Sequence, residues 1–154
     1  MNLKFVLEDT KKFLVERINI FGNNVTRESV IRNQIEIDEG DPFNQILYAK
    51  SLNNIKALNF FESVNGEILD GNEFNTKIIN IEINEKATGE IFAGVGTGTG
   101  GSSFSAGLKE KNYLGKGITL DTNFALSDDE VRGKFSVMNP NFRNSDRSLN
   151  TTIE

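Results

Sequence analysis

The positions of apolar residues divide the chain into two parts with different periodicities. In the first part, Phe13–Phe21 and Lys77–Glu85 alternate along the chain, which predicts two strands. Phe60–Leu69 is predicted to be a third strand, which forms a hairpin with Lys77–Glu85 through a turn at residues 70–72. Two segments between Phe13–Phe21 and Phe60–Leu69 have apolar residues at helical spacing instead. The order strand, helix, helix, strand, strand predicts an α+β layer, with two short helices on one face of a three-stranded sheet.

Each predicted helix is preceded by a residue suited to cap its first turn. Thr26 precedes the first helix and Asn44 precedes the second, and both residue types are preferred N-caps. Tyr48, Leu52 and Ile55 follow at the spacing that places side chains on one face of a helix. We therefore expect the helices to begin close to Thr26 and Asn44, and the second helix to bury that face.

From Gly89 onward the pattern alternates with a period of two, and ten of the 14 glycines lie in this part. Segments of about ten residues that place apolar and polar side chains on opposite faces are typical of a transmembrane β-barrel. A soluble antiparallel meander with one wet face gives the same alternation, so both structures fit the pattern. The five predicted strands occupy residues 90–98, 103–109, 118–127, 131–137 and 148–154.

The barrel is favoured because the alternation repeats with no helix to cover the apolar face. Five strands are fewer than the roughly eight that the smallest membrane barrels contain, so the sheet is either soluble or the start of a truncated barrel. We predict an α+β domain over residues 11–87 and an antiparallel β-meander over residues 88–154 that begins a transmembrane β-barrel.

Composition excludes most catalytic chemistry. The net charge of -5, from 17 basic and 22 acidic residues, argues against nucleic acid as a partner. The chain has no Cys and no His, so thiolate chemistry and the commonest general base and metal ligand are missing. We expect no catalytic residue, no metal site and no cofactor, and we do not expect an enzyme.

Three short motifs are better explained as local structure. Gly96–Gly101 matches G-x-G-x-x-G, but residues 102–107 alternate as a strand where a dinucleotide site requires a helix. Residues 114–117 lack the first glycine of a phosphate-binding loop and are predicted to be a turn. The acidic clusters at 38–41 and 128–130 lack the spacing of a calcium loop and are predicted to be solvated loops.

Several segments, taken together, resemble a known family. Val15–Asn23, followed by two short helices and a β-hairpin, resembles a POTRA domain. Gly94–Gly98, Asn112–Gly117 and Asn139–Phe142 then occur in the order found at the start of a BamA barrel. Nearly the whole chain thus resembles the BamA family of outer-membrane β-barrel assembly factors, as the last POTRA domain plus the first barrel strands.

Two further segments bear on this resemblance. Residues 1–10, with apolar alternation over 3–8, would be the end of a preceding POTRA repeat. Val131–Lys134 imitates the family's Val-Arg-Gly-Phe/Tyr motif, but it lies in a predicted strand and lacks the aromatic residue, so no role is transferred to it.

The resemblance implies a location and a set of partners. The POTRA part would lie in the periplasm and the strands in the cell outer membrane. The implied partners are unfolded outer-membrane proteins, accessory assembly lipoproteins and outer-membrane lipid, with no nucleic acid. The implied function is assembly and insertion of β-barrel proteins.

Two strands are candidate sites for this function. An exposed sheet edge can pair with an extended client strand, which is β-augmentation. The expected client-pairing residues are Phe60, Phe61, Glu62, Ser63 and Val64. The first barrel strand of the family meets the last in a weak seam, and the residues expected in this seam strand are Glu90, Phe92, Gly94, Gly96 and Gly98.

Two other functions remain open at this point. A two-partner secretion translocator would share the POTRA and barrel arrangement but would export a polypeptide through its pore. A soluble POTRA-type protein-binding module would have no membrane role and would dissolve without detergent.

Overall fold

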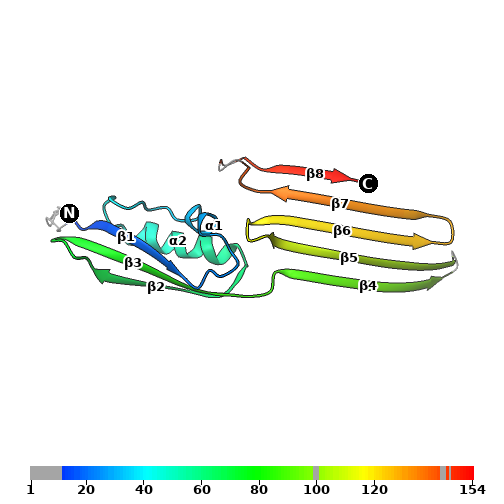
Figure 1. Ribbon diagram of the computed structural model, residues 1–154, viewed down its shortest axis with the longest axis horizontal. Helices are drawn as coiled ribbons and strands as arrows, with labels where there is room; N and C mark the ends of the chain where they lie inside the picture. The colour runs from blue at the N-terminus through cyan, green and yellow to red at the C-terminus, as the bar shows by residue number, and fades with distance from the viewer. Residues whose placement is uncertain (1–11, 99–100, 143–144, 146) are drawn as a thin grey trace, which may run out of the picture.

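Figure 1 shows the computed structural model, which describes residues 12–98, 101–142, 145 and 147–154. Two sheets follow one another along the chain. The first unit contains β1 (Leu14–Phe21), α1 (Glu28–Arg32), α2 (Gln45–Ala57), β2 (Phe61–Asp70) and β3 (Thr76–Glu85). The second contains β4 (Gly89–Gly98), β5 (Gly101–Tyr113), β6 (Ile118–Ser127), β7 (Val131–Asn139) and β8 (Leu149–Ile153).

The first sheet has the order β1-β3-β2, and both helices lie against it (Figure 1). The central strand β3 runs parallel to β1 and antiparallel to β2. Ile79, Ile81 and Ile83 point from β3 into the core, as their alternation predicts. The predicted α+β layer is confirmed. Its other buried apolar residues are Val15, Ile18, Ile31, Ile37, Tyr48, Ile55, Phe60, Phe61, Val64 and Ile78.

The second helix begins where the sequence predicts. The Asn44 side-chain oxygen accepts hydrogen bonds from the N–H groups of Ile46 (2.8 Å) and Leu47 (3.3 Å). Two of the first-turn donors that a helix leaves without partners are thereby satisfied. Tyr48 and Ile55 are buried, and Leu52 packs against the same core.

The predicted role of Thr26 as an N-cap is wrong. The N-cap of α1 is Arg27, and its side chain makes no capping hydrogen bond. Thr26 is instead 2% exposed, and its hydroxyl is held by a residue of the second sheet, Asn112. A long-range contact thus takes the hydroxyl that the local pattern assigned to the helix.

The second sheet is an antiparallel meander with strand order β4-β5-β6-β7-β8. Its strands agree with the five predicted segments to within a few residues at each end. β5 begins at Gly101, so a strand stands where a dinucleotide site would require a helix. Residues 3–8, expected to end a preceding repeat, lie outside the described residues.

The two faces of the meander differ in chemistry. Residues opposite one another on neighbouring strands share a face. One such row across all five strands is Ile91, Leu108, Thr122, Phe135 and Ile153. The opposite face carries the row Glu90, Lys109, Asp121, Ser136 and Thr152. The sheet therefore has an apolar and a polar face, as the alternation predicts.

Candidate functional sites: two strand edges and the domain junction

The edges of the first sheet differ in how their backbone groups are satisfied. The β1 edge is covered by the loop at 38–42: Val15 donates its N–H to Asp41 O, and Gly40 donates to Val15 O. Ile18 N donates to Glu39 Oε1 at 2.9 Å, and an Arg32 guanidinium N–H donates to Ile18 O at 3.0 Å. The acidic loop thus closes this edge to further strands.

The β2 edge carries no comparable cover. In the described part of the chain, no hydrogen bond outside the sheet reaches the backbone of residues 61–70. The register is irregular between Phe61 and Ser63 and regular from Ser63 to Asp70. An open edge of this kind is able to accept another strand.

The five residues predicted to pair with clients are divided between the core and this edge. Phe61 and Val64 are buried, whereas Glu62 and Ser63 are exposed. Phe60 lies just before the strand and is only 6% exposed. The side chains of Phe60, Phe61 and Val64 therefore hold the strand on the core and leave its backbone at the edge.

The predicted seam strand, β4, forms one edge of the second sheet. Little packs on its polar face: a Cβ added to Gly94 would meet only Ser105 Oγ at 3.5 Å, and one added to Gly98 would meet nothing within 4 Å. Gly96 has only Ser103 Oγ nearby, at 2.9 Å from an added Cβ. This glycine-rich end of β4 offers few side-chain contacts to a neighbouring strand.

The other end of β4 is better packed. The ring of Phe92 covers Gly107, where an added Cβ would lie 2.3 Å from Phe92 Cζ and 2.5 Å from Thr122 O. Glu90, the first of the predicted seam residues, is exposed and forms a long ion pair with Lys111 at 3.8 Å. Side-chain packing along β4 thus decreases from Phe92 toward Gly98.

The apolar face of the meander is exposed. Ile91 and Val95 are 85% and 84% exposed, and neither helix covers this face. A continuous apolar surface marks a site of contact with a membrane or with protein. Its other large side chains, at 42–66% exposure, are Phe104, Phe124, Leu126, Val131, Phe135 and Ile153.

The two sheets meet at the turn between β5 and β6. Leu114, Gly115 and Gly117 have positive φ, and this turn lies against the segment before α1. The Arg27 N–H donates to Gly115 O at 2.9 Å, and Asn112 Nδ2 donates to Thr26 Oγ1 at 2.8 Å. The predicted turn at 114–117 is confirmed, and it also joins the two units.

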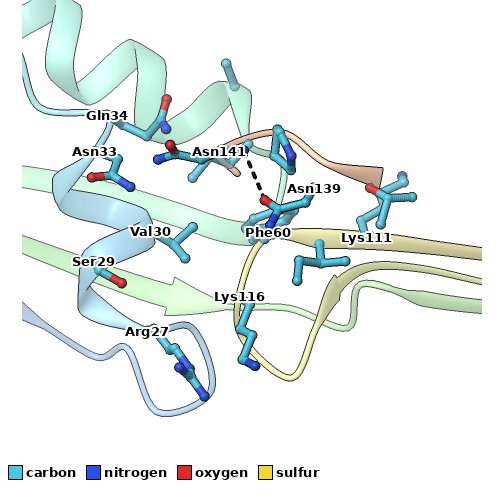
Figure 2. Close-up of a pocket in the computed structure, with 16 residues that line it drawn as sticks. Arg27, Ser29, Val30, Asn33, Gln34, Phe60, Lys111, Lys116, Asn139 and Asn141 are labelled. Carbon is cyan, nitrogen blue, oxygen red and sulfur yellow. Dashed lines mark hydrogen bonds between the residues drawn. The ribbon is translucent and has the colours of Figure 1, made fainter. Parts of the chain in front are cut away.

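A cleft of about 460 Å³ lies beside this junction (Figure 2). Val30 and Phe60 contribute apolar surface from the first unit, and Lys116 comes from the turn. Residues of both units therefore line this cleft.

Glu85, at the end of β3, collects hydrogen bonds next to the junction. Its carboxylate accepts from the N–H groups of Val25 (2.8 Å) and Thr26 (2.6 Å). Burial raises the pKa of Glu85, but hydrogen bonds from the Thr26 hydroxyl and from backbone N–H groups outweigh burial and lower the pKa overall. The carboxylate is therefore held in its charged form.

Sequence reasoning missed Thr26, Asn112 and Glu85 as junction residues. The only signal in the sequence is the segment Asn112–Gly117, which carries part of the family resemblance. Nothing in that segment indicates its partner, because Thr26 lies 86 residues away along the chain.

No helix in the described ranges is long and apolar enough to cross a membrane. Among the described residues there is also no cluster of three or more acidic side chains arranged to hold a metal ion. The loop at 128–130 instead pairs with its neighbours, since Asp128 accepts from Ser102 N and Glu130 pairs with Arg132.

Comparison with known proteins agrees with this arrangement. The POTRA family, described as a surface antigen variable number repeat, matches residues 13–86. BamA of Buchnera aphidicola is 28% identical over 96% of this chain and 24% of its own length. BamA of Neisseria meningitidis is 26% identical over 88% of this chain and 17% of its own length.

A solved structure covers both units together. The crystal structure of BamA from Haemophilus ducreyi lacking POTRA domains 1–3 superposes on 92% of this chain with a TM-score of 0.80 and 29% identity. The chain is thus similar to BamA over both units. It spans about a quarter or less of the relatives that it matches.

These likenesses confirm the predicted fold, which is a POTRA domain followed by the antiparallel strands that begin a β-barrel. The relatives are named as outer membrane protein assembly factors, which agrees with the predicted location in the outer membrane. CdiB from Acinetobacter baumannii shares the fold over 83% of this chain, with a TM-score of 0.53 and 12% identity. That likeness concerns the fold alone.

Proposed function

We propose that this chain is the part of an outer-membrane β-barrel assembly factor that receives unfolded clients and passes them into the membrane. The relatives named as outer membrane protein assembly factors support this role. The observation that carries it is the side-chain packing along the terminal strand β4, which weakens toward Gly98, in a sheet with one exposed apolar face. The alternative is that the protein is a two-partner secretion translocator, which exports a polypeptide through its pore.

Client binding is assigned to the β2 edge. Its backbone groups are free to form main-chain hydrogen bonds, which give affinity without demanding a particular client sequence. The β1 edge, closed by Glu39 and Asp41, is not used. Unfolded outer-membrane proteins suit this mode because their strands are already extended.

Client insertion is assigned to the β4 edge. A closed barrel has no free edge, so a new strand enters only where an existing pair opens. Gly94, Gly96 and Gly98 supply no side-chain contact across that pair, which lowers the free energy needed to open it. Clients then leave sideways into the lipid that contacts the apolar face.

The remaining partners follow from the same role. Accessory assembly lipoproteins would bind the periplasmic POTRA surface, and outer-membrane lipid would contact the row that contains Ile91 and Phe135. The process is physical strand exchange, so it uses no catalytic residue and no cofactor. Nucleic acid is not a partner for a chain with a net charge of -5.

Replacing Gly96 and Gly98 with Val in the full-length protein tests the seam. Gly98 has open space for a side chain, and at Gly96 an added Cβ lies 2.9 Å from the Ser103 hydroxyl, which has to rotate away. The Val side chains would pack across the seam and stabilise its closed form, so client insertion into lipid vesicles slows several-fold. The measurement is the rate at which a client becomes resistant to protease.

Gly133→Val is the control, since Gly133 lies in β7 away from the seam, on the apolar face, and an added Cβ there meets nothing within 4 Å. This variant keeps the unmodified insertion rate. Equal slowing in both variants, or no slowing in the seam variant, contradicts the proposal. Release of the client as soluble polypeptide on the far side of the vesicle would instead support export.

A further inference from the structure

The segment Asn112–Gly117 has a defined local structure that client binding and insertion do not explain. The Asn112 side-chain oxygen accepts from the Gly117 N–H at 2.8 Å, which ties the two ends of the turn together. Positive φ at Leu114, Gly115 and Gly117 winds the turn tightly between them. The turn is thereby a preformed surface rather than a loose connection.

This surface fits closely onto the POTRA domain. A Cβ added to Gly115 would lie 2.0 Å from Val25 O, so the two backbones approach closely only because this residue is glycine. Asn112 and Thr26 are 6% and 2% exposed, and the 2.8 Å hydrogen bond between their side chains is buried. The Arg27 N–H adds a backbone hydrogen bond to Gly115 O.

The same hydrogen bonds continue into both strands that flank the connection between the units. On the POTRA side, Glu85 accepts from the backbone N–H of Thr26. On the sheet side, Glu110 accepts from the Thr88 hydroxyl and from the Asn112 N–H (2.7 Å). A carboxylate thus lies on each side of the connection at residues 86–88. Glu85 binds the segment before α1, and Glu110 binds the start of the turn.

We propose that Thr26 and Asn112 are positioning residues that hold the POTRA domain in one orientation relative to the β-sheet. A three-residue connection alone permits the units to rotate about β3 and β4. The buried amide–hydroxyl pair removes that freedom, because rotation would leave both groups buried without a partner or expose them to water. A fixed orientation of the two units also keeps the β2 edge and the β4 edge in one arrangement for client transfer. This last step rests on the proposed function.

The test measures orientation directly. The chain has no cysteine, so Glu67→Cys in β2 and Asn123→Cys in β6 give one spin-label pair that spans the junction. Double electron–electron resonance on the whole chain in detergent should give a single narrow distance distribution. Thr26→Val, which keeps the shape but removes the hydroxyl, should broaden the distribution and shift its mean.

Thr26→Ser is the matched control, because it keeps the hydroxyl and should restore the narrow distribution. A second label pair within the POTRA domain, at Lys56 and Glu67, should stay narrow in every variant, which shows that Thr26→Val folds. An unchanged junction distribution in Thr26→Val, or equal broadening in Thr26→Ser, overturns the proposal. Client insertion is not measured here, so failure of the proposed function leaves this result unaffected.

Discussion

At the scale of single residues, carboxylates in this chain hold backbone in place. Glu16 in β1 accepts hydrogen bonds from the backbone and side chain of Asn72 (both 2.7 Å) and from the Thr76 hydroxyl (2.7 Å). The hydrogen bond from the Thr76 hydroxyl, then that from the Asn72 side chain, and those from backbone N–H groups lower the pKa of Glu16 to about 2, and burial opposes them. Glu16 thus fixes the turn between β2 and β3 from the opposite edge of the sheet.

This contact makes stability depend on acid pH. Because the pKa of Glu16 is about 2 when folded and 4.5 when unperturbed, its contribution is fully present above pH 4.5 and is lost as the pH falls toward 2. We expect Glu16→Gln to lower the melting temperature at pH 7. We also expect the melting temperature of this variant to fall less between pH 4.5 and pH 2 than that of the unmodified chain. Thermal unfolding followed by circular dichroism measures both.

Glu67→Gln is the control for this prediction, since Glu67 is exposed and lies on β2 away from the turn. Glu67→Gln should leave both the melting temperature at pH 7 and its fall between pH 4.5 and pH 2 unchanged. A Glu16→Gln protein whose pH profile matches that of the unmodified chain would show that the hydrogen bonds to Glu16 contribute no stability.

At the scale of elements, the two edges of the POTRA sheet differ because of one loop. Residues 38–42 occupy the β1 edge, so an incoming strand would have to displace several hydrogen bonds. The β2 edge has no such cover in the described residues, and its ladder is regular from Ser63 onward. The acidic cluster at residues 38–41, predicted to be a solvated loop, therefore helps to determine that β2, and not β1, is the edge open to a client strand.

Cross-linking tests this choice. Ser63→Cys is exposed on the β2 edge, whereas Glu82→Cys is exposed on the central strand β3. With a client peptide that carries one cysteine in an extended segment, Ser63→Cys should form a mixed disulfide several-fold faster. Non-reducing gels measure the rates, and equal rates at the two positions would argue against pairing at β2.

At the scale of the whole molecule, the apolar face of the meander dominates solution behaviour. The row of Ile91, Leu108, Phe135 and Ile153 and its neighbours form one surface without cover from the described helices. Such a surface associates with itself in water and is solvated by lipid or detergent. It also lies on a sheet with two open edges, which favours aggregation.

We therefore expect the chain to aggregate in water and to be monodisperse in detergent. Size-exclusion chromatography with light scattering, with and without a mild detergent, measures this. A detergent-free monomer would indicate that the face is covered in solution, and it would favour the soluble POTRA-type binding module.

The local sequence pattern was sufficient to predict the helices and strands and which face of each strand is apolar. Alternation with period two predicted the strands of the second sheet and β1 and β3 of the first, because side chains of a strand alternate between faces whatever their partners. β2 was predicted from the hairpin turn at residues 70–72, since its buried residues Phe61 and Val64 lie three apart. Asn44 was predicted as a cap because its hydrogen bonds reach only two and three residues along the chain. The order of the short motifs also indicates the resemblance to the BamA family without reference to the fold.

Tertiary structure decided the features that depend on distant partners. Thr26 has the local signature of a cap, yet its hydroxyl is bound by Asn112, and no periodicity reports a contact between residues 86 positions apart. The closing of the β1 edge by Glu39 likewise required the fold. The sequence by itself determined the strands and their two faces, whereas the packing of the two units determined which edges stay open and how the units are joined.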